Sequence, residues 1–354
     1  MPFNKSYTSL AMAIALPALL AGCGGSSNAP VAQAPHYTFT ELIPPNGNHY
    51  VDAVGINAGG QVLVNTRPTF TSNQHQAYIY ANGAFTDLNP IDPQHNTTGL
   101  YINDAGKVVY LADSGNTAQL SIYSGGTGAS LPADPLGGGS VPFAFANDGS
   151  LIVHKSTNFA KYSGGSWTTV TTPSGFTTFQ PLGFAPDSSI IASTDQGIVV
   201  GGGTTFTHYG QIPAGTIELN DTAFVNAHGQ IAGNAGSDIS QNITPWFGVA
   251  TSGLRELPAM PNTPASTATV THTIAVTGIS GNGSVVGLGL TPGASQYGII
   301  LWINGEPFNV TPEANLPALH NQVIVGGISD NGTISAWYVD SIGQEHAFIM
   351  TPTP

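Results

Sequence analysis

One pattern of apolar and polar positions recurs seven times along the chain. Each copy has an apolar residue, three mostly small or polar residues, a turn residue, a polar residue and a second apolar residue, as in INAGGQV from Ile56. The turn residues are Gly60, Gly106, Gly149, Ser188, Gly229, Gly283 and Gly332. Because glycine, asparagine and aspartate tolerate the backbone angles of tight hairpins, each copy predicts two short antiparallel strands joined by a turn.

A second pair of strands is predicted after each hairpin. In the first copy it is QAYIYANGAFTDLNP, residues 76–90, where an aromatic strand, a glycine turn and a further strand follow one another. Four short strands about every 40 to 50 residues are the sequence pattern of a β-propeller blade. We therefore predict an all-β fold, a β-propeller of seven four-stranded blades over residues 36–354, with six or eight blades left open. Several first strands carry a glycine next to the turn, which suits strands crowded close together: Gly55, Gly183, Gly278 and Gly327.

The last repeat reaches only its third strand, HAFIM, residues 346–350. The segment YTFTELIPP, residues 37–45, precedes every complete repeat and has no blade of its own. Its Phe-Thr-Glu-Leu run, residues 39–42, parallels Phe-Thr-Asp-Leu at residues 85–88 of the first repeat. We predict that residues 37–42 pair with residues 346–350 as the outermost strand of the last blade. This pairing closes the ring and covers an edge that would otherwise promote aggregation.

The first 35 residues have a different character from the repeats. An apolar run from Leu10 to Leu20 is shorter than the roughly 20 residues that cross a bilayer, which is typical of a signal peptide. It leads into Leu-Ala-Gly-Cys, residues 20–23, which resembles the bacterial lipobox; Cys23 is the only cysteine. We predict a lipoprotein signal peptide over residues 1–22, a lipidated Cys23 with a flexible tether over residues 23–35, and the propeller over 36–354.

The lipobox resemblance also implies a location. It implies a bacterial protein of the cell envelope, held on the membrane by lipid on Cys23. Because Gly24 rather than aspartate follows the cysteine, the usual sorting pattern of bacterial lipoproteins favours the outer membrane.

The repeat itself resembles the HAF repeat of exported bacterial proteins. The resemblance is carried by GIN and GQV around the first turn, by His346-Ala347-Phe348, and by a degenerate copy at Gln76-Ala77-Tyr78. It implies an exported, propeller-like protein. The family brings no established reaction, so no catalytic residue is carried over.

Charge and motif content exclude several function classes. After the segment that contains Lys5, the basic residues are scattered against nineteen acidic ones: Arg67, Lys107, Lys155, Lys161 and Arg255. Nucleic-acid binding needs clustered lysine and arginine, so we exclude that partner. The ten histidines show no metal-ligand spacing, and the chain has no second cysteine, no GxSxG and no P-loop. We predict no bound metal and no cofactor.

Two aspartates form the one candidate binding pair. Asp52 and Asp221 lie eight residues before their turn residues, in the first strands of the first and fifth repeats. A ring would place them across a channel at similar depth, where they could serve a cation or a sugar hydroxyl. The alternative is a pair of solvated aspartates near the channel mouth. They are too few and too far apart for acid–base catalysis.

The predicted function is recognition. We expect a monomeric, membrane-anchored exported propeller that acts as a binding module for a protein or glycan, because propellers present variable loops on a rigid ring. Two alternatives remain open. One is an envelope structural or assembly scaffold, and the other is a carbohydrate-active enzyme that uses carboxylates at the channel face.

Overall fold

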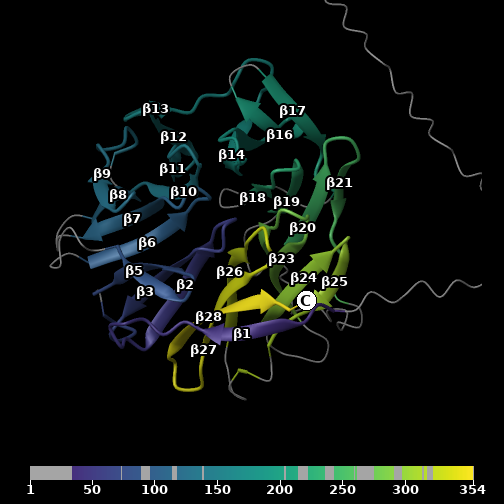
Figure 1. Cartoon of the computed structure of the whole chain (residues 1–354). Helices are drawn as coiled ribbons and strands as arrows, with labels where there is room; N and C mark the ends of the chain where they lie inside the picture. The colour runs from purple at the N-terminus through teal and green to yellow at the C-terminus, as the bar shows by residue number, and fades with distance from the viewer. Residues whose placement is uncertain are drawn as a thin grey trace, which may run out of the picture. The chain divides into compact units, whose positions relative to one another are not determined.

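The fold is built from short β-strands arranged around a centre. The computed structural model describes residues 34–72, 74–88, 96–113, 118–137, 139–202, 205–213, 222–235, 243–258, 260, 275–290, 297–312, 315–316 and 322–353. Within these ranges the regular structure is entirely β-strand, and they contain no helix that could span a membrane. The sheets follow one another in chain order around a common centre, with the yellow C-terminal strands beside the purple N-terminal ones (Figure 1). This arrangement is the predicted propeller.

Five sheets each contain four antiparallel strands that pair in chain order. The first two hold β6 (Asn96–Ile102), β7 (Val108–Asp113), β8 (Ala118–Ser124) and β9 (Thr127–Ser130), then β10 (Val141–Phe145), β11 (Leu151–Lys155), β12 (Asn158–Ser163) and β13 (Ser166–Thr169). The third holds β14 (Phe179–Phe184), β15 (Ile190–Thr194), β16 (Gly197–Gly202) and β17 (Thr205–Gly210). The other two hold β18 (Ala223–Val225), β19 (Gln230–Ala235), β20 (Thr244–Val249) and β21 (Gly253–Glu256), then β22 (Ala275–Ile279), β23 (Val285–Leu290), β24 (Tyr297–Ile303) and β25 (Glu306–Asn309).

The sixth sheet has eight strands and contains both ends of the described chain. Its strands are β1 (Tyr37–Glu41), β2 (Tyr50–Ile56), β3 (Val62–Arg67), β4 (Gln76–Ala81), β5 (Ala84–Asp87), β26 (Gln322–Ile328), β27 (Ile334–Val339) and β28 (Glu345–Pro352). Five separate blades are therefore found where we predicted seven. The physical reason is a parallel bridge between Tyr50 of β2 and Glu345 of β28, which joins the first repeat to the last in one sheet.

The turns of the repeat form the predicted hairpins. In the first copy, the amide of Asn57 donates to the carbonyl of Gln61 at 3.0 Å, and the amide of Gly60 donates to the carbonyl of Asn57 at 3.0 Å. All seven turn residues have positive φ, including Ser188 at 67°. Glycine adopts this backbone region without steric cost, which is why six of the seven copies use it.

Three of the four predicted glycines lie where strands crowd together. A Cβ placed on Gly183 would lie 2.5 Å from the carbonyl oxygen of Ala223, and one on Gly278 would lie 3.2 Å from the amide nitrogen of Ile328. Gly327 has a φ of 150° and would bring a Cβ within 3.3 Å of Ile56. A Cβ placed on Gly55 would lie 3.9 Å or farther from its nearest neighbours, so close packing does not require glycine there.

The predicted pairing of the N-terminal strand with the last repeat is confirmed. Strand β1 runs antiparallel to β28, with Phe39 opposite Met350 and Glu41 opposite Phe348. The amide of Leu42 then donates to the carbonyl of Ala347 at 2.8 Å, as the amide of Leu88 does to Ala77 in the first repeat at 3.0 Å. The sequence parallel between the two segments therefore corresponds to the same place in a blade.

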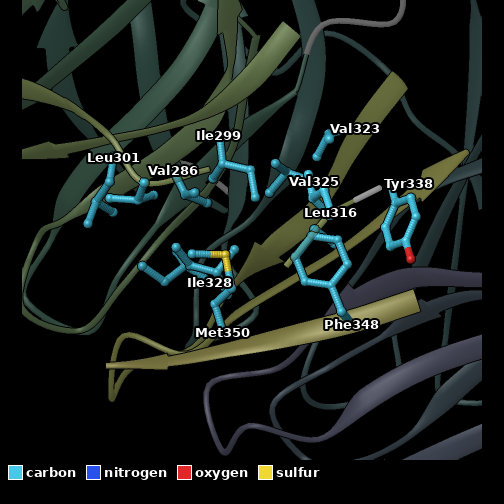
Figure 2. Packing of buried hydrophobic residues seen from close by; sticks show 13 residues of the cluster. Val286, Ile299, Leu301, Leu316, Val323, Val325, Ile328, Tyr338, Phe348 and Met350 are labelled. Carbon is cyan, nitrogen blue, oxygen red and sulfur yellow. The ribbon is translucent and has the colours of Figure 1, made fainter. Parts of the chain in front are cut away.

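Strand β1 also packs into a hydrophobic core. Phe348 and Met350 are 0% and 1% exposed, and Figure 2 shows both reaching from β28 into a cluster where Met350 lies beside Ile328. Tyr37 and Phe39 of β1 pack against this cluster, and the ring centroids of Phe39 and Phe348 are 4.9 Å apart. The strand thus contributes apolar contacts as well as hydrogen bonds to the seam between the chain ends.

Candidate functional site

A cavity of about 460 Å³ lies among the first strands of all the repeats. Its walls come from β2, β6, β10, β14, β18, β22 and β26, together with residues of the turns that follow several of these strands. Each strand contributes only a few residues, so the cavity exists only because the strands are held around one centre. A volume of this size falls within the range of about 300–1,000 Å³ that is typical of small-molecule sites.

The cavity has an aromatic wall and a glycine-rich wall. The aromatic residues of the lining come from β6, β10, β14 and β18, and each is partly buried: Tyr101, Phe143, Phe145, Phe184 and Phe224. The glycines of the lining come mainly from β2, β22 and β26: Gly55, Gly278, Gly326 and Gly327, with Gly183 on β14. The Tyr101 hydroxyl donates to the carbonyl of Pro142 at 3.2 Å, and burial raises the pKa of Tyr101 to about 12, so the phenol stays neutral.

Hydrogen bonds link the turns around one rim of the cavity. The amide of Ala58 donates to Asp104 Oδ1 at 2.8 Å, and the amide of Asp104 donates to Asn147 Oδ1 at 2.9 Å. Asn147 Nδ2 donates to the carbonyl of Pro186 at 3.0 Å, and the amide of Asp330 donates to the carbonyl of Ala58 at 3.1 Å. These residues all occupy the third position of the repeated motif. The last bond connects the final repeat to the first.

Buried asparagines reinforce the same connections. Asn57 Nδ2 donates to the carbonyl of Asn103 at 3.0 Å, and Asn103 Nδ2 donates to the carbonyl of Ala146 at 2.6 Å. Asn226 Nδ2 donates to the carbonyl of Ser280 at 2.9 Å. A buried amide left without partners costs about 1–3 kcal/mol, so these side chains fix the spacing of neighbouring turns. The cavity rim is therefore preorganised.

A second polar cluster lies where the first and last repeats meet. Burial, the negative charge of Glu345 and a hydrogen bond to Glu345 together raise the pKa of Asp52 to about 7, and the charge of Arg67 opposes them. The Oδ1 atom of Asp52 is buried without a hydrogen-bond partner. At neutral pH this carboxyl group therefore lies near the midpoint of its titration.

Arg67 holds Glu345 in place. Its Nη2 lies 2.5 Å from Oε1 and 2.7 Å from Oε2 of Glu345, whose side chain is only 5% exposed. The guanidinium carbon lies 4.9 Å from the centroid of the Phe70 ring and 5.8 Å from that of Tyr50. Burial lowers the pKa of the nearby His75, and the charge of Arg67 lowers it further. One guanidinium thus faces two carboxyl groups, and only one of these is firmly paired.

The structure describes one of the two predicted aspartates. Asp52 lies on β2, outside the lining of the cavity, which begins at Val54 on that strand. Asp221 and Cys23 lie outside the described residues. A binding role for Asp52 and Asp221, and lipidation of Cys23, therefore stay predictions.

Two residues that share the site with Asp52 were not predicted. Glu345 and Arg67 are far from Asp52 along the chain, and the meeting of β2 and β28 brings them together. The available signals were weak: Glu345 directly precedes the HAF motif, and Arg67 is one of six basic residues. In the described ranges, no group of three or more His, Cys, Asp or Glu side chains could hold a metal ion.

Comparisons with known proteins concern the fold. No family model matches the chain, and no curated protein matches it. Virginiamycin B lyase from Staphylococcus aureus is similar, with a TM-score of 0.51, 13% identity, and coverage of 90% of this chain and 100% of that one. The β-propeller domain of the Trilobed protease from Pyrococcus furiosus has a TM-score of 0.53, 8% identity, and coverage of 85% of this chain and 95% of that one. At such identity the likeness shows the fold alone: this chain is an all-β propeller.

Proposed function

We propose that this chain is an exported, lipid-anchored β-propeller that acts as a binding module for a protein or glycan partner. The observation that carries the proposal is the central cavity, whose aromatic and glycine walls come from seven strands and whose rim is fixed by hydrogen bonds between turns. A preorganised cavity lowers the entropy cost of binding, which suits recognition. The module needs no cofactor, binds no nucleic acid and acts as a monomer.

We also propose that the ring contains seven blades. The eight-stranded sheet divides at its single parallel bridge into β2–β5 and β26–β28 with β1, and each part has the four-strand order of the separate blades. The seven first strands around the cavity support this division.

The proposed anchor gives a direct prediction. Cys23→Ser is expected to leave the propeller folded, because the cysteine precedes the repeats, but to release the protein from the membrane fraction or to stall processing of the signal peptide. Membrane fractionation and the mass of the mature N-terminus measure this. The matched control is Ser26→Ala in the tether, which should fractionate like the wild type. Unchanged membrane association and processing of Cys23→Ser would rule out the lipid anchor.

The screen for a partner uses residues 34–354 without signal or lipid. A glycan array and a pull-down from envelope extracts test the two partner classes side by side. We expect one partner to be retained, and its retention to be lost in Phe145→Ala, which removes an aromatic ring from the cavity wall. Ile342→Ser, at an apolar side chain that is 75% exposed and outside the cavity lining, is the control. A partner that binds Phe145→Ala as well as the wild type would exclude the cavity as the site.

The two other functions make different demands. An assembly scaffold would bind envelope proteins through its outer faces, so blocking the cavity would not change their retention. An enzyme would need a carboxyl pair that substrate can reach. The Asp52 and Glu345 pair has one carboxyl group near the midpoint of its titration, but Glu345 is 4% exposed and bound to Arg67. The pair is closed in this arrangement, and binding is the better-supported function.

A further inference from the structure

The charges around the cavity limit what it can hold. Among the described residues of its lining, the charged ones are Asp104 and Asp330, and none is lysine or arginine. An anionic ligand would therefore be repelled by two carboxylates at the rim. The cavity favours a ligand that is uncharged or positively charged.

The aromatic wall argues against a positively charged ligand. A cation would be attracted by aromatic rings, as in the cages that bind quaternary ammonium groups. However, the ammonium nitrogen of Lys161 already lies 5.6 Å from the centroid of the Phe184 ring. A second cation at this ring would be repelled by Lys161, which itself lies outside the cavity lining. An uncharged ligand meets neither this repulsion nor that of the rim carboxylates.

Two polar groups of the lining lack a hydrogen-bond partner, and one of them is open to such a ligand. The Thr277 hydroxyl is buried and has no hydrogen-bond partner. The Asp330 side chain is exposed at the rim, and no described residue donates a hydrogen bond to its carboxylate. The Asp104 carboxylate, in contrast, already accepts from the amide of Ala58 and from Asn147 Nδ2. The free carboxylate accepts hydrogen bonds, so the ligand should donate them.

We propose that the cavity binds an uncharged sugar ring at the end of a glycan, an inference that rests on the proposed binding function. The apolar C–H face of the ring packs on the aromatic wall around Phe145 and Phe184, and its hydroxyls donate to the carboxylate of Asp330. The glycine wall leaves room for a flat ring opposite the aromatic side chains. The volume suits a small ring system, not a folded segment of protein.

The test measures binding of uncharged, anionic and cationic glycans to residues 34–354 on an array, followed by calorimetric titration of the retained glycans. The array includes the N-acetylglucosamine tetramer and its cationic glucosamine counterpart, and a neutral glucan tetramer and its anionic uronic acid counterpart. Tetramethylammonium serves as a simple organic cation.

We expect uncharged glycans to be retained. Asp330→Asn and Phe145→Ala should each weaken their binding by about tenfold to a hundredfold, as loss of a hydrogen bond to a charged group or of a stacked ring predicts. Phe145→Tyr keeps the ring and should restore most of the affinity. Glu256→Gln, at an exposed carboxylate on β21, should bind like the wild type. Thermal unfolding of each variant checks that the fold is intact.

Each other outcome overturns the inference in a recognisable way. If the array retains the cationic tetramer in place of the neutral glycans, or if tetramethylammonium binds in the calorimetric titration, the cavity is a cation site. If no uncharged glycan binds, but an envelope protein is retained in a manner that depends on Phe145, the sugar inference fails while the binding function stands. If neither class of partner is retained, both fail.

Discussion

Asp52→Asn is expected to remove a large pH dependence of stability. Burial, with the neighbouring Glu345, raises the pKa of Asp52 from an ordinary 3.8 to about 7. That difference corresponds to about 4 kcal/mol between the two protonation states, because one pH unit is about 1.4 kcal/mol. In the folded protein the protonated Asp52 donates to Glu345, and asparagine can donate in the same way without ionising.

The direction of the effect follows from the raised pKa. The folded state binds the Asp52 proton more tightly than the unfolded state does, so the contribution of this group is greatest below about pH 4. It falls as the pH rises and is lost above about pH 7. At that pH two carboxylates face the single guanidinium of Arg67. The free energy of unfolding of the wild type should therefore fall, relative to Asp52→Asn, between about pH 4 and 7.

Urea unfolding of both proteins at several pH values measures this difference. We expect the two stabilities to be close near pH 4 and Asp52→Asn to be more stable by several kcal/mol at pH 8. The control is Glu306→Gln, an exposed carboxylate on β25, whose difference from the wild type should stay small at every pH. A difference for Asp52→Asn that does not change with pH would show that Asp52 ionises normally in the folded protein.

Removal of strand β1 is the second change with a large expected effect. A chain that begins at Pro44 lacks residues 36–43 and leaves β28 with an unpaired edge from Phe348 to Pro352. It also loses Leu42, which is 2% exposed, and the packing of Tyr37 and Phe39. Burial of one such side chain contributes about 1.5–3 kcal/mol, so the total loss is about 5 kcal/mol.

The expected result is a melting temperature lower by about 7 °C, together with aggregation through the exposed edge of β28. Chains that begin at Gly24 and at His36 are the matched pair that isolates the tether. They should melt alike, because residues 24–35 are predicted to form a flexible tether outside the blades. Calorimetry and light scattering give both quantities. Equal melting of the chains that begin at His36 and Pro44 would contradict a structural role for β1.

The repeat made much of the fold predictable from the sequence. The hairpin turns were predictable because glycine at positions such as Gly60 and Gly332 meets a local backbone requirement. Strand β1 was predictable because residues 39–42 repeat the chemistry of residues 85–88, and both leucines occupy the same buried place in a blade. Local patterns that recur predict local structure well.

Features that depend on contacts between repeats were not predictable. The side-chain amides of Asn65 and Asn234 form hydrogen bonds to the backbone of the next repeat. Asn65 Nδ2 donates to the carbonyl of Gly99 at 3.0 Å, and the backbone amide of Gly99 donates to Asn65 Oδ1 at 2.8 Å. The partners of Asp52 likewise come from other strands and depend on how the chain ends meet. The joining of two repeats into one sheet depends on a single bridge at Tyr50, which no pattern within a repeat encodes.

Blocking the cavity is the most direct test of the proposed binding function. The only cysteine of the chain is Cys23, so residues 34–354 contain none, and Ala227→Cys introduces a unique thiol at an exposed position of the cavity lining without removing a proposed ligand contact. A bulky maleimide on that thiol should abolish retention of the partner, while the same label on Glu256→Cys, on the outer strand β21, should leave it unchanged. Equal binding by both labelled proteins would contradict the account.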